Sequence, residues 1–111
     1  MTHIYVIATQ EQFDKKTVKI GQTKNMKTLK QRLETGNAFH VDPIKVFCLY
    51  DVGDVMDPSD KGLHSLLEDS RIVGRGGGEE FFFNLTSKQI RESIEAMFGK
   101  NNVKAIKETE F

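Results

Sequence analysis

Basic side chains gather in one stretch near the N-terminus of the chain. Seven lysines and arginines fall between positions 15 and 32, and no acidic residue lies among them. The whole chain carries a formal net charge of +0, so the excess is local. Lysine binds phosphate as a point charge, and the planar arginine guanidinium matches two phosphate oxygens at once. The stretch therefore predicts a phosphate-binding surface, formed by Lys15, Lys16, Lys19, Lys24, Lys27, Lys30 and Arg32.

A second polar group falls in a segment predicted to be a helix from position 57 to about 69 or 71. On a helical wheel, Asp60, His64 and Arg71 share the arc of the leucines that should pack on a sheet. An unpaired buried polar group destabilises the fold by on the order of 1–3 kcal/mol. The polar side chains on such a face therefore either border a cleft or hydrogen-bond to one another. Taken singly, Asp60 is also explained as a helix-capping acid, and His64 as a core histidine bonded to a carbonyl.

Two further acids, Glu79 and Glu80, stand directly before three phenylalanines at 81–83. They are read first as solvated residues that guard an apolar strand against aggregation, and second as carboxylates at the edge of a cleft. No CxxC or HExxH pattern occurs, which argues against a structural zinc site or a zincin.

Length and composition predict one soluble globular domain over residues 1–111, with a core at about 3–99 and a tail at 100–111. No apolar run is long enough to span a membrane, and the N-terminus does not read as a signal peptide. The single cysteine, Cys48, lies in an apolar run and is expected to be a buried thiol. Together these features predict an intracellular protein.

The elements that must position these residues follow from hydrophobic periodicity and capping signals. Strands are predicted over 3–9, 17–22, 44–52 and 80–85, with the first central in its sheet and the third antiparallel or mixed. One helix is predicted to start at Asn25 and stop at Gly36-Asn37, and the last to start at a Thr86–Gln89 capping box and end at Gly99. Residues 10–16 are expected to form a loop, and residues 101–111 to fray.

Several short motifs occur in a fixed order between residues 3 and 85. They are Ile4-Tyr5; Lys19-Ile20-Gly21 with Thr23; Arg32-Leu33 before Gly36-Asn37; Asp60 to His64; and Arg71 with Gly78-Glu79-Glu80-Phe81-Phe82. This ordered set resembles the GIY-YIG nuclease superfamily, and within it the compact phage and bacterial branch. The resemblance implies an α+β fold, with a small, mainly antiparallel three-stranded sheet flanked by helices.

The same resemblance implies metal-dependent hydrolysis of phosphodiester bonds with one divalent ion, usually magnesium. Tyr5 or Lys19 would activate or orient the attacking water, and Arg32 would clamp the scissile phosphate. His64 would assist proton transfer or position the phosphate.

On the metal side, the resemblance implies an acid on the second long helix, which is Asp60 here, with Glu80 as the alternative ligand. Three departures from the family pattern stand in the sequence. His3 replaces the first glycine, Lys19 replaces the second tyrosine, and aspartate replaces glutamate at position 60. Lys24, Lys27, Lys30 and Arg71 are assigned to contacts with the nucleic-acid backbone.

Three functions follow from these observations. The leading one is a small endonuclease that acts on DNA rather than RNA, with no membrane partner. Its specificity would come from a partner protein or from a second copy of the chain. The second is a catalytically degenerate nucleic-acid-binding module of the same fold. The third is a regulatory domain that binds protein alone, which zero net charge and the aromatic segment 81–83 permit.

Overall fold

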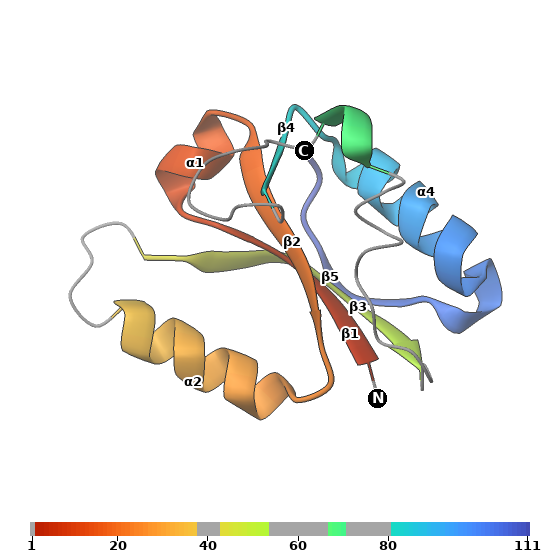
Figure 1. The fold of residues 1–111 in the computed structure, drawn as a ribbon, viewed down its shortest axis with the longest axis horizontal. Coiled ribbons are helices and arrows are strands. Elements are labelled where there is room, and N and C mark those ends of the chain that lie inside the picture. Colours follow the sequence, from red (N-terminus) through yellow and green to blue (C-terminus); the bar gives the residue numbers. More distant parts are fainter. Residues whose placement is uncertain (1, 38–42, 54–66, 71–80) are drawn as a thin grey trace.

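A computed structural model describes residues 2–37, 43–53, 67–70 and 81–111 of the chain. Figure 1 shows one antiparallel sheet with a helix on each face. In chain order the elements are β1 (Thr2–Ala8), α1 (Gln10–Asp14), β2 (Thr17–Thr23), α2 (Met26–Asn37), β3 (Lys45–Gly53), β4 (Phe81–Phe83), α4 (Ser87–Phe98) and β5 (Lys104–Glu108). Short 3-10 turns cover Glu68–Ser70 and Lys100–Asn102.

The sheet confirms the predicted α+β class and its antiparallel pairing. Its strand order is β4-β2-β1-β3-β5, so β1 is central, as its continuous apolar sequence predicted. The expected number of strands was wrong, because the sheet has five strands and not three. Both edges lie beyond the three strands of that expectation: β4, which falls in the predicted strand 80–85, pairs with β2, and β5, which was not predicted, pairs with β3.

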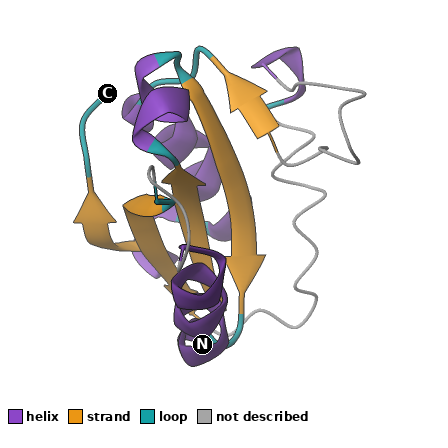
Figure 2. Cartoon of the chain, turned by 90° about the vertical axis from the view of Figure 1, so that its left-hand side faces the viewer, coloured by secondary structure: helices purple, strands orange, loops and turns teal. Residues whose placement is uncertain are grey.

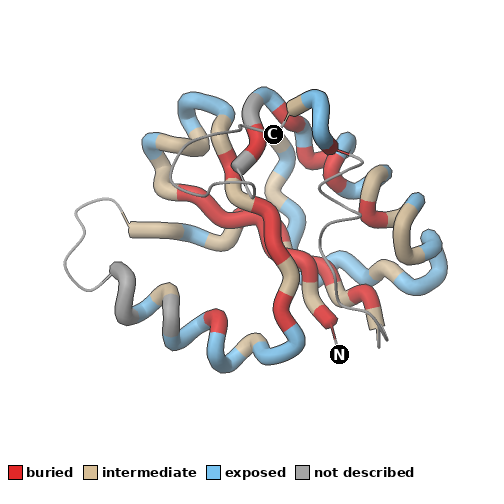
Figure 3. The backbone as a smooth tube through the Cα atoms, viewed as in Figure 1, coloured by how far each residue is buried: buried red, intermediate tan, exposed pale blue. Residues whose placement is uncertain are grey.

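The main core lies between the sheet and α4 (Figure 3). Alternate residues of β1 and β2 point to this face, and Ile4, Val6 and Ile20 are fully buried there. Ile90 and Ile94 of α4 are also fully buried, one helical turn apart. The predicted capping box opens this helix: Thr86 Oγ1 accepts from Gln89 N at 3.2 Å, and Thr86 N donates to Gln89 Oε1 at 2.9 Å.

The other face of the sheet carries a smaller cluster under α2. Tyr5, Ile7 and Leu29 are its buried members. Leu29 is the single buried residue among the α2 positions whose side chains the structure describes. The helix begins as predicted, because Asn25 Oδ1 accepts a hydrogen bond from Thr28 N at 3.2 Å. Helix α2 is therefore held to the sheet by a narrow apolar stripe.

Residues 10–16 do not form the predicted loop. They contain the short helix α1, which opens with a second capping box. Thr9 Oγ1 accepts from Gln12 N at 3.1 Å, and Thr9 N donates to Gln12 Oε1 at 3.0 Å. Its Phe13 stacks on Phe47 of β3, with the ring centroids 3.9 Å apart. A threonine followed three residues later by glutamine was a signal for this helix.

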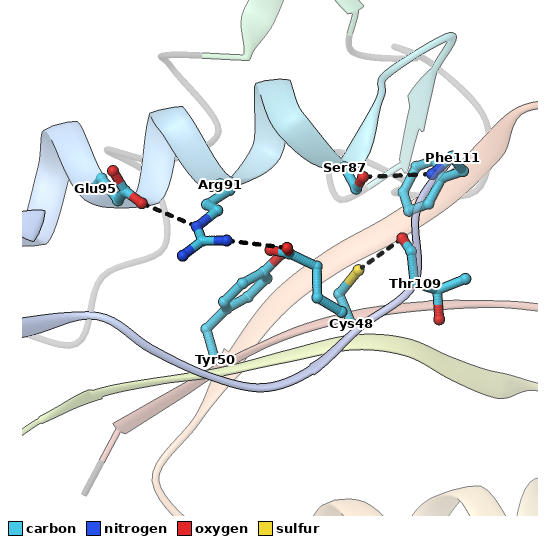
Figure 4. Close-up of polar contacts among 8 residues, drawn as sticks. Cys48, Tyr50, Ser87, Arg91, Glu95, Thr109 and Phe111 are labelled. Carbon is cyan, nitrogen blue, oxygen red and sulfur yellow. Dashed lines mark hydrogen bonds and ion pairs between the residues drawn. The ribbon is translucent and has the colours of Figure 1, made fainter.

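The C-terminal residues are ordered in the sheet and do not fray as predicted. Strand β5 pairs with β3, and Thr109 N donates to Phe47 O at 3.0 Å. Figure 4 shows how side chains tie β5 to β3 and α4. Tyr50 Oη donates to Glu108 Oε2 at 2.7 Å, and Arg91 Nη1 donates to Glu108 Oε1 at 3.1 Å. One carboxylate therefore joins three elements.

Two of the buried groups beneath β5 are held in their neutral forms. Burial raises the pKa of Tyr50, and the hydrogen bond to Glu108 raises it further. The phenol therefore stays protonated through the neutral and mildly alkaline range and keeps donating to Glu108. Burial also raises the pKa of the Cys48 thiol, whose Sγ lies 3.7 Å from Thr109 O. Cys48 is thus the buried, unreactive thiol that its apolar surroundings predicted.

The predicted helix from 57 to 69 or 71 lies largely outside the described residues, of which Leu67 and the turn Glu68–Ser70 belong to that region. The glycine-rich segment 74–78 lies outside them entirely. Within the described part of the chain, no helix has the length and apolarity needed to cross a membrane.

Candidate nucleic-acid interface

The α2 face of the sheet brings together several residues that the sequence singled out. The β1–β2 register pairs Tyr5 with Gly21 and Ile7 with Lys19. Side chains of directly opposed residues share one face of a sheet. Tyr5 and Ile7 contact Leu29 of α2, so Lys19 belongs to this face as well. Figure 2 shows the sheet from the side, with the helices lying along it.

Glycine is required at position 21 because the Tyr5 ring lies against its backbone. A Cβ built on Gly21 would stand 2.6 Å from Tyr5 Cζ and even closer to the phenol oxygen. Side-chain carbons do not approach this closely, so any larger residue would push the ring away. The absence of a side chain at Gly21 thus lets the Tyr5 hydroxyl lie close to the β2 backbone.

We predict that Gly21→Ala destabilises the protein by about 1–3 kcal/mol, because it overpacks the contact with Tyr5. The measurement is the midpoint of urea unfolding. The matched variant is Gly21→Ala combined with Tyr5→Leu, which removes the ring that the new methyl group meets. If the two substitutions add without coupling, the ring is not the obstacle.

The connection from β2 to α2 exposes the basic residues of the helix. Thr23 Oγ1 accepts from Asn25 N at 3.1 Å and lies 3.2 Å from Asn25 O, which fixes the turn. Lys24, Lys27 and Lys30 then follow at intervals of three residues, and all are exposed. Residues three apart on a helix are neighbours on its surface, so Lys27 and Lys30 extend from Lys24 as one row, here called the lysine row.

Not all predicted site residues can be placed on this face. Arg32 lies in α2, but its side chain is outside what the structure describes. Asp60, His64, Arg71 and Glu80 are in the segments 54–66 and 71–80, which are also outside it. Among the described residues, no three His, Cys, Asp or Glu side chains come close enough together to hold a metal ion. The metal ligands therefore stay a prediction from the sequence.

The structure adds His3, which the sequence marked only as a replacement for glycine. It lies two residues before Tyr5 on β1, so it shares the α2 face, and it pairs with Thr23 and Asp51 on the flanking strands. Its Nδ1 atom is buried and has no hydrogen-bond partner. Buried polar atoms are usually paired, so an unpaired imidazole nitrogen marks a position that can accept or donate a bond. The unpaired nitrogen of His3 is apparent from its place in the sheet and not from the sequence.

The geometry defines a small α+β domain whose α2 face combines a tyrosine, a histidine and a lysine on the sheet with exposed lysines on the helix. A family model described as the T5orf172 domain matches residues 2–98. The chain therefore belongs to the T5orf172 domain family. This family is associated with nuclease-like and DNA-binding modules, which agrees with a function related to nucleic acid. No curated protein and no solved structure matches the chain.

The family match corrects the resemblance stated from the sequence, because the matching family is the T5orf172 domain and not GIY-YIG. The motifs behind that resemblance were two or three residues long, and folding alone accounts for several of them. Ile4 and Ile20 are core residues, Gly21 accommodates the Tyr5 ring, and Leu33 belongs to the apolar stripe of α2. Residues needed by a sheet and its helix recur in many families, so their order was a weak guide to ancestry.

Proposed function

We propose that this T5orf172 domain binds DNA along the α2 face of its sheet and hydrolyses phosphodiester bonds there. The observation that carries the proposal is the exposed lysine row, which belongs to the helix that covers the sheet face of Tyr5, His3 and Lys19. Lysine side chains neutralise phosphates and release the counterions condensed on DNA, which drives binding without regard to sequence. In this proposal the lysine row contacts the phosphates of the DNA backbone. Lys19, which is half-buried on the sheet, contacts the phosphate nearest to Tyr5.

Within this proposal, the Tyr5 hydroxyl and the Lys19 ammonium orient the water that attacks phosphorus. Arg32 and Arg71 hold the phosphate oxygens through paired hydrogen bonds. His64 takes part in proton transfer. The chemistry of each side chain suits its proposed role, which requires the group to lie within hydrogen-bond reach of the phosphate.

Asp60 and Glu80 offer carboxylate oxygens, the ligands that magnesium prefers, so their chemistry fits a divalent cation. A cation held there supplies positive charge to neutralise the charge that develops on the leaving oxygen. The proposal assigns the metal to Asp60, with Glu80 as the alternative ligand.

The test of this function is nicking of a supercoiled plasmid in magnesium. Wild-type protein is expected to nick it, and Arg32→Ala and Asp60→Ala are each expected to lower the rate by at least about 10²-fold, the scale of one lost charge-stabilising group. Lys88→Ala, an exposed lysine on α4, is the matched control and should keep the wild-type rate. Cleavage that survives both substitutions would come from a contaminant. Tight DNA binding without cleavage in magnesium, manganese or cobalt would reduce the function to binding.

A further inference from the structure

An apolar groove runs between α2 and the edge of the sheet formed by β3 and β5. Its volume is about 520 Å³. Its apolar walls are Met26, Leu29 and Leu33 from α2, Val46 and Leu49 from β3, and Ile106 from β5. Ile106 is 53% exposed and is the large hydrophobic residue that stands out on the described surface. An exposed isoleucine beside half-buried leucines and a methionine forms a continuous apolar patch, which is typical of an interaction site.

The rim of this groove is basic. Lys27 and Lys30 line it from α2, and Lys107 lines it from β5. Among the described residues that line the groove, none is acidic and none is aromatic. The groove therefore presents aliphatic side chains at its base and positive charge along its sides.

These two properties identify the occupant. A nucleobase placed in the groove would bury hydrogen-bonding edges among aliphatic groups that cannot pair with them, and it would find no ring to stack on. An amphipathic helix avoids that cost, because its backbone polar groups are bonded within the helix. Its apolar side chains at i, i+3, i+4 and i+7 fill such a groove. Acidic residues beside that stripe would meet the three lysines.

Among the helices that the structure describes, neither α2 nor α4 of a second copy offers such a free apolar stripe. The apolar stripe of α4 is buried in its own core, with Ile90 and Ile94 fully enclosed. The stripe of α2 is itself one wall of the groove. The described helices of this chain therefore do not supply the occupant, and the proposal assigns the groove to a helix of another protein.

We propose that the α2–β5 groove docks an amphipathic helix with acidic flanks from a partner protein. The α2 residues that line the groove run from Met26 to Leu33, so this wall is about 12 Å long and faces about two turns of a bound helix. The groove shares Lys27 and Lys30 with the lysine row, but its apolar walls, which include Ile106 and Met26, take no part in the proposed catalysis.

The test measures, by fluorescence anisotropy, how tightly the full chain binds a stapled helical peptide. The peptide has leucines at i, i+3, i+4 and i+7 and glutamates at its other positions. A second peptide carries lysines in place of the glutamates. The glutamate peptide is expected to bind at least about tenfold more tightly than the lysine peptide. Equal binding of the two peptides, or no binding of either, would overturn the proposal.

The variants locate the site. Ile106→Ser and Met26→Gln remove apolar surface from opposite walls and are each expected to weaken binding of the glutamate peptide by about tenfold. Ala105→Ser, the neighbouring exposed position on β5, is the control and should leave it unchanged. DNA affinity should be the same in Ile106→Ser and in wild type. If Ile106→Ser weakens binding of single-stranded oligonucleotide instead of peptide, the groove is a nucleic-acid site and the proposal fails.

Discussion

Replacing Lys24, Lys27 and Lys30 together by alanine is expected to weaken DNA binding roughly 10²–10³-fold at 0.1 M salt. Each lysine that neutralises a phosphate releases a counterion and adds about 0.9 to the slope of log affinity against log salt for duplex DNA. Losing three such contacts should therefore lower the slope by nearly three units. The fold should be unaffected, because all three side chains are exposed. Fluorescence anisotropy over a range of salt concentrations measures both quantities.

The matched control removes the same charge elsewhere. Lys45, Lys88 and Lys100 are exposed and lie at the start of β3, on α4 and in the turn after α4. Their triple replacement by alanine changes the net charge equally, so it should alter the slope little if binding is confined to the α2 face. Equal losses in the two triple variants would mean that DNA attraction is a diffuse property of the surface and not a property of the lysine row.

Ending the chain at Gly99 is expected to lower the free energy of unfolding by about 3–5 kcal/mol, a large part of the stability of a small domain. The cut removes β5 and opens the edge of β3, which uncovers Cys48 and Tyr50. It also removes Phe111, whose ring lies 5.0 Å from that of Phe13 and whose backbone bonds to Ser87. Urea unfolding followed by circular dichroism is the measurement.

A smaller change separates the side-chain contribution from that of the strand. Tyr50→Phe keeps β5 and removes only the hydrogen bond from the phenol to Glu108, so it should cost about 1–3 kcal/mol. The shortened chain should therefore unfold at a lower urea concentration than Tyr50→Phe. If it unfolds at the same concentration as the full chain, β5 does not support the core. The family match ends at residue 98, so this prediction concerns a strand outside the matched region.

The elements that could be predicted from the sequence are those whose signals are local. The apolar run of β1, the capping boxes and the glycine after α4 each act over a few residues, and the structure has them within one or two positions. The capping box at Thr9 and Gln12 was equally local and was overlooked. Strand β5 is different, because its sequence 104–108 alternates poorly and all five of its residues are exposed. Its pairing is decided by the edge of β3 and by Glu108, which lies 58 residues from Tyr50.

The candidate site likewise has features with a local sequence signal and features that depend on the folded sheet. The excess of lysines was visible in the sequence. The contact between Tyr5 and Gly21 depends on the register of β1 against β2, and the unpaired nitrogen of His3 depends on its neighbours in the sheet. The apolar groove needs α2, β3 and β5 together, so no single stretch of sequence predicts it.

The placement of the two tyrosines has a spectroscopic consequence. The chain has no tryptophan and two tyrosines, so its intrinsic ultraviolet emission comes from Tyr5 and Tyr50 alone. They lie on opposite faces of the sheet, Tyr5 under α2 and Tyr50 bonded to the carboxylate of Glu108. A phenol bonded to a carboxylate emits weakly, so Tyr5 should dominate the signal. The native chain thus carries a built-in optical label on the face to which both DNA and a partner helix are assigned.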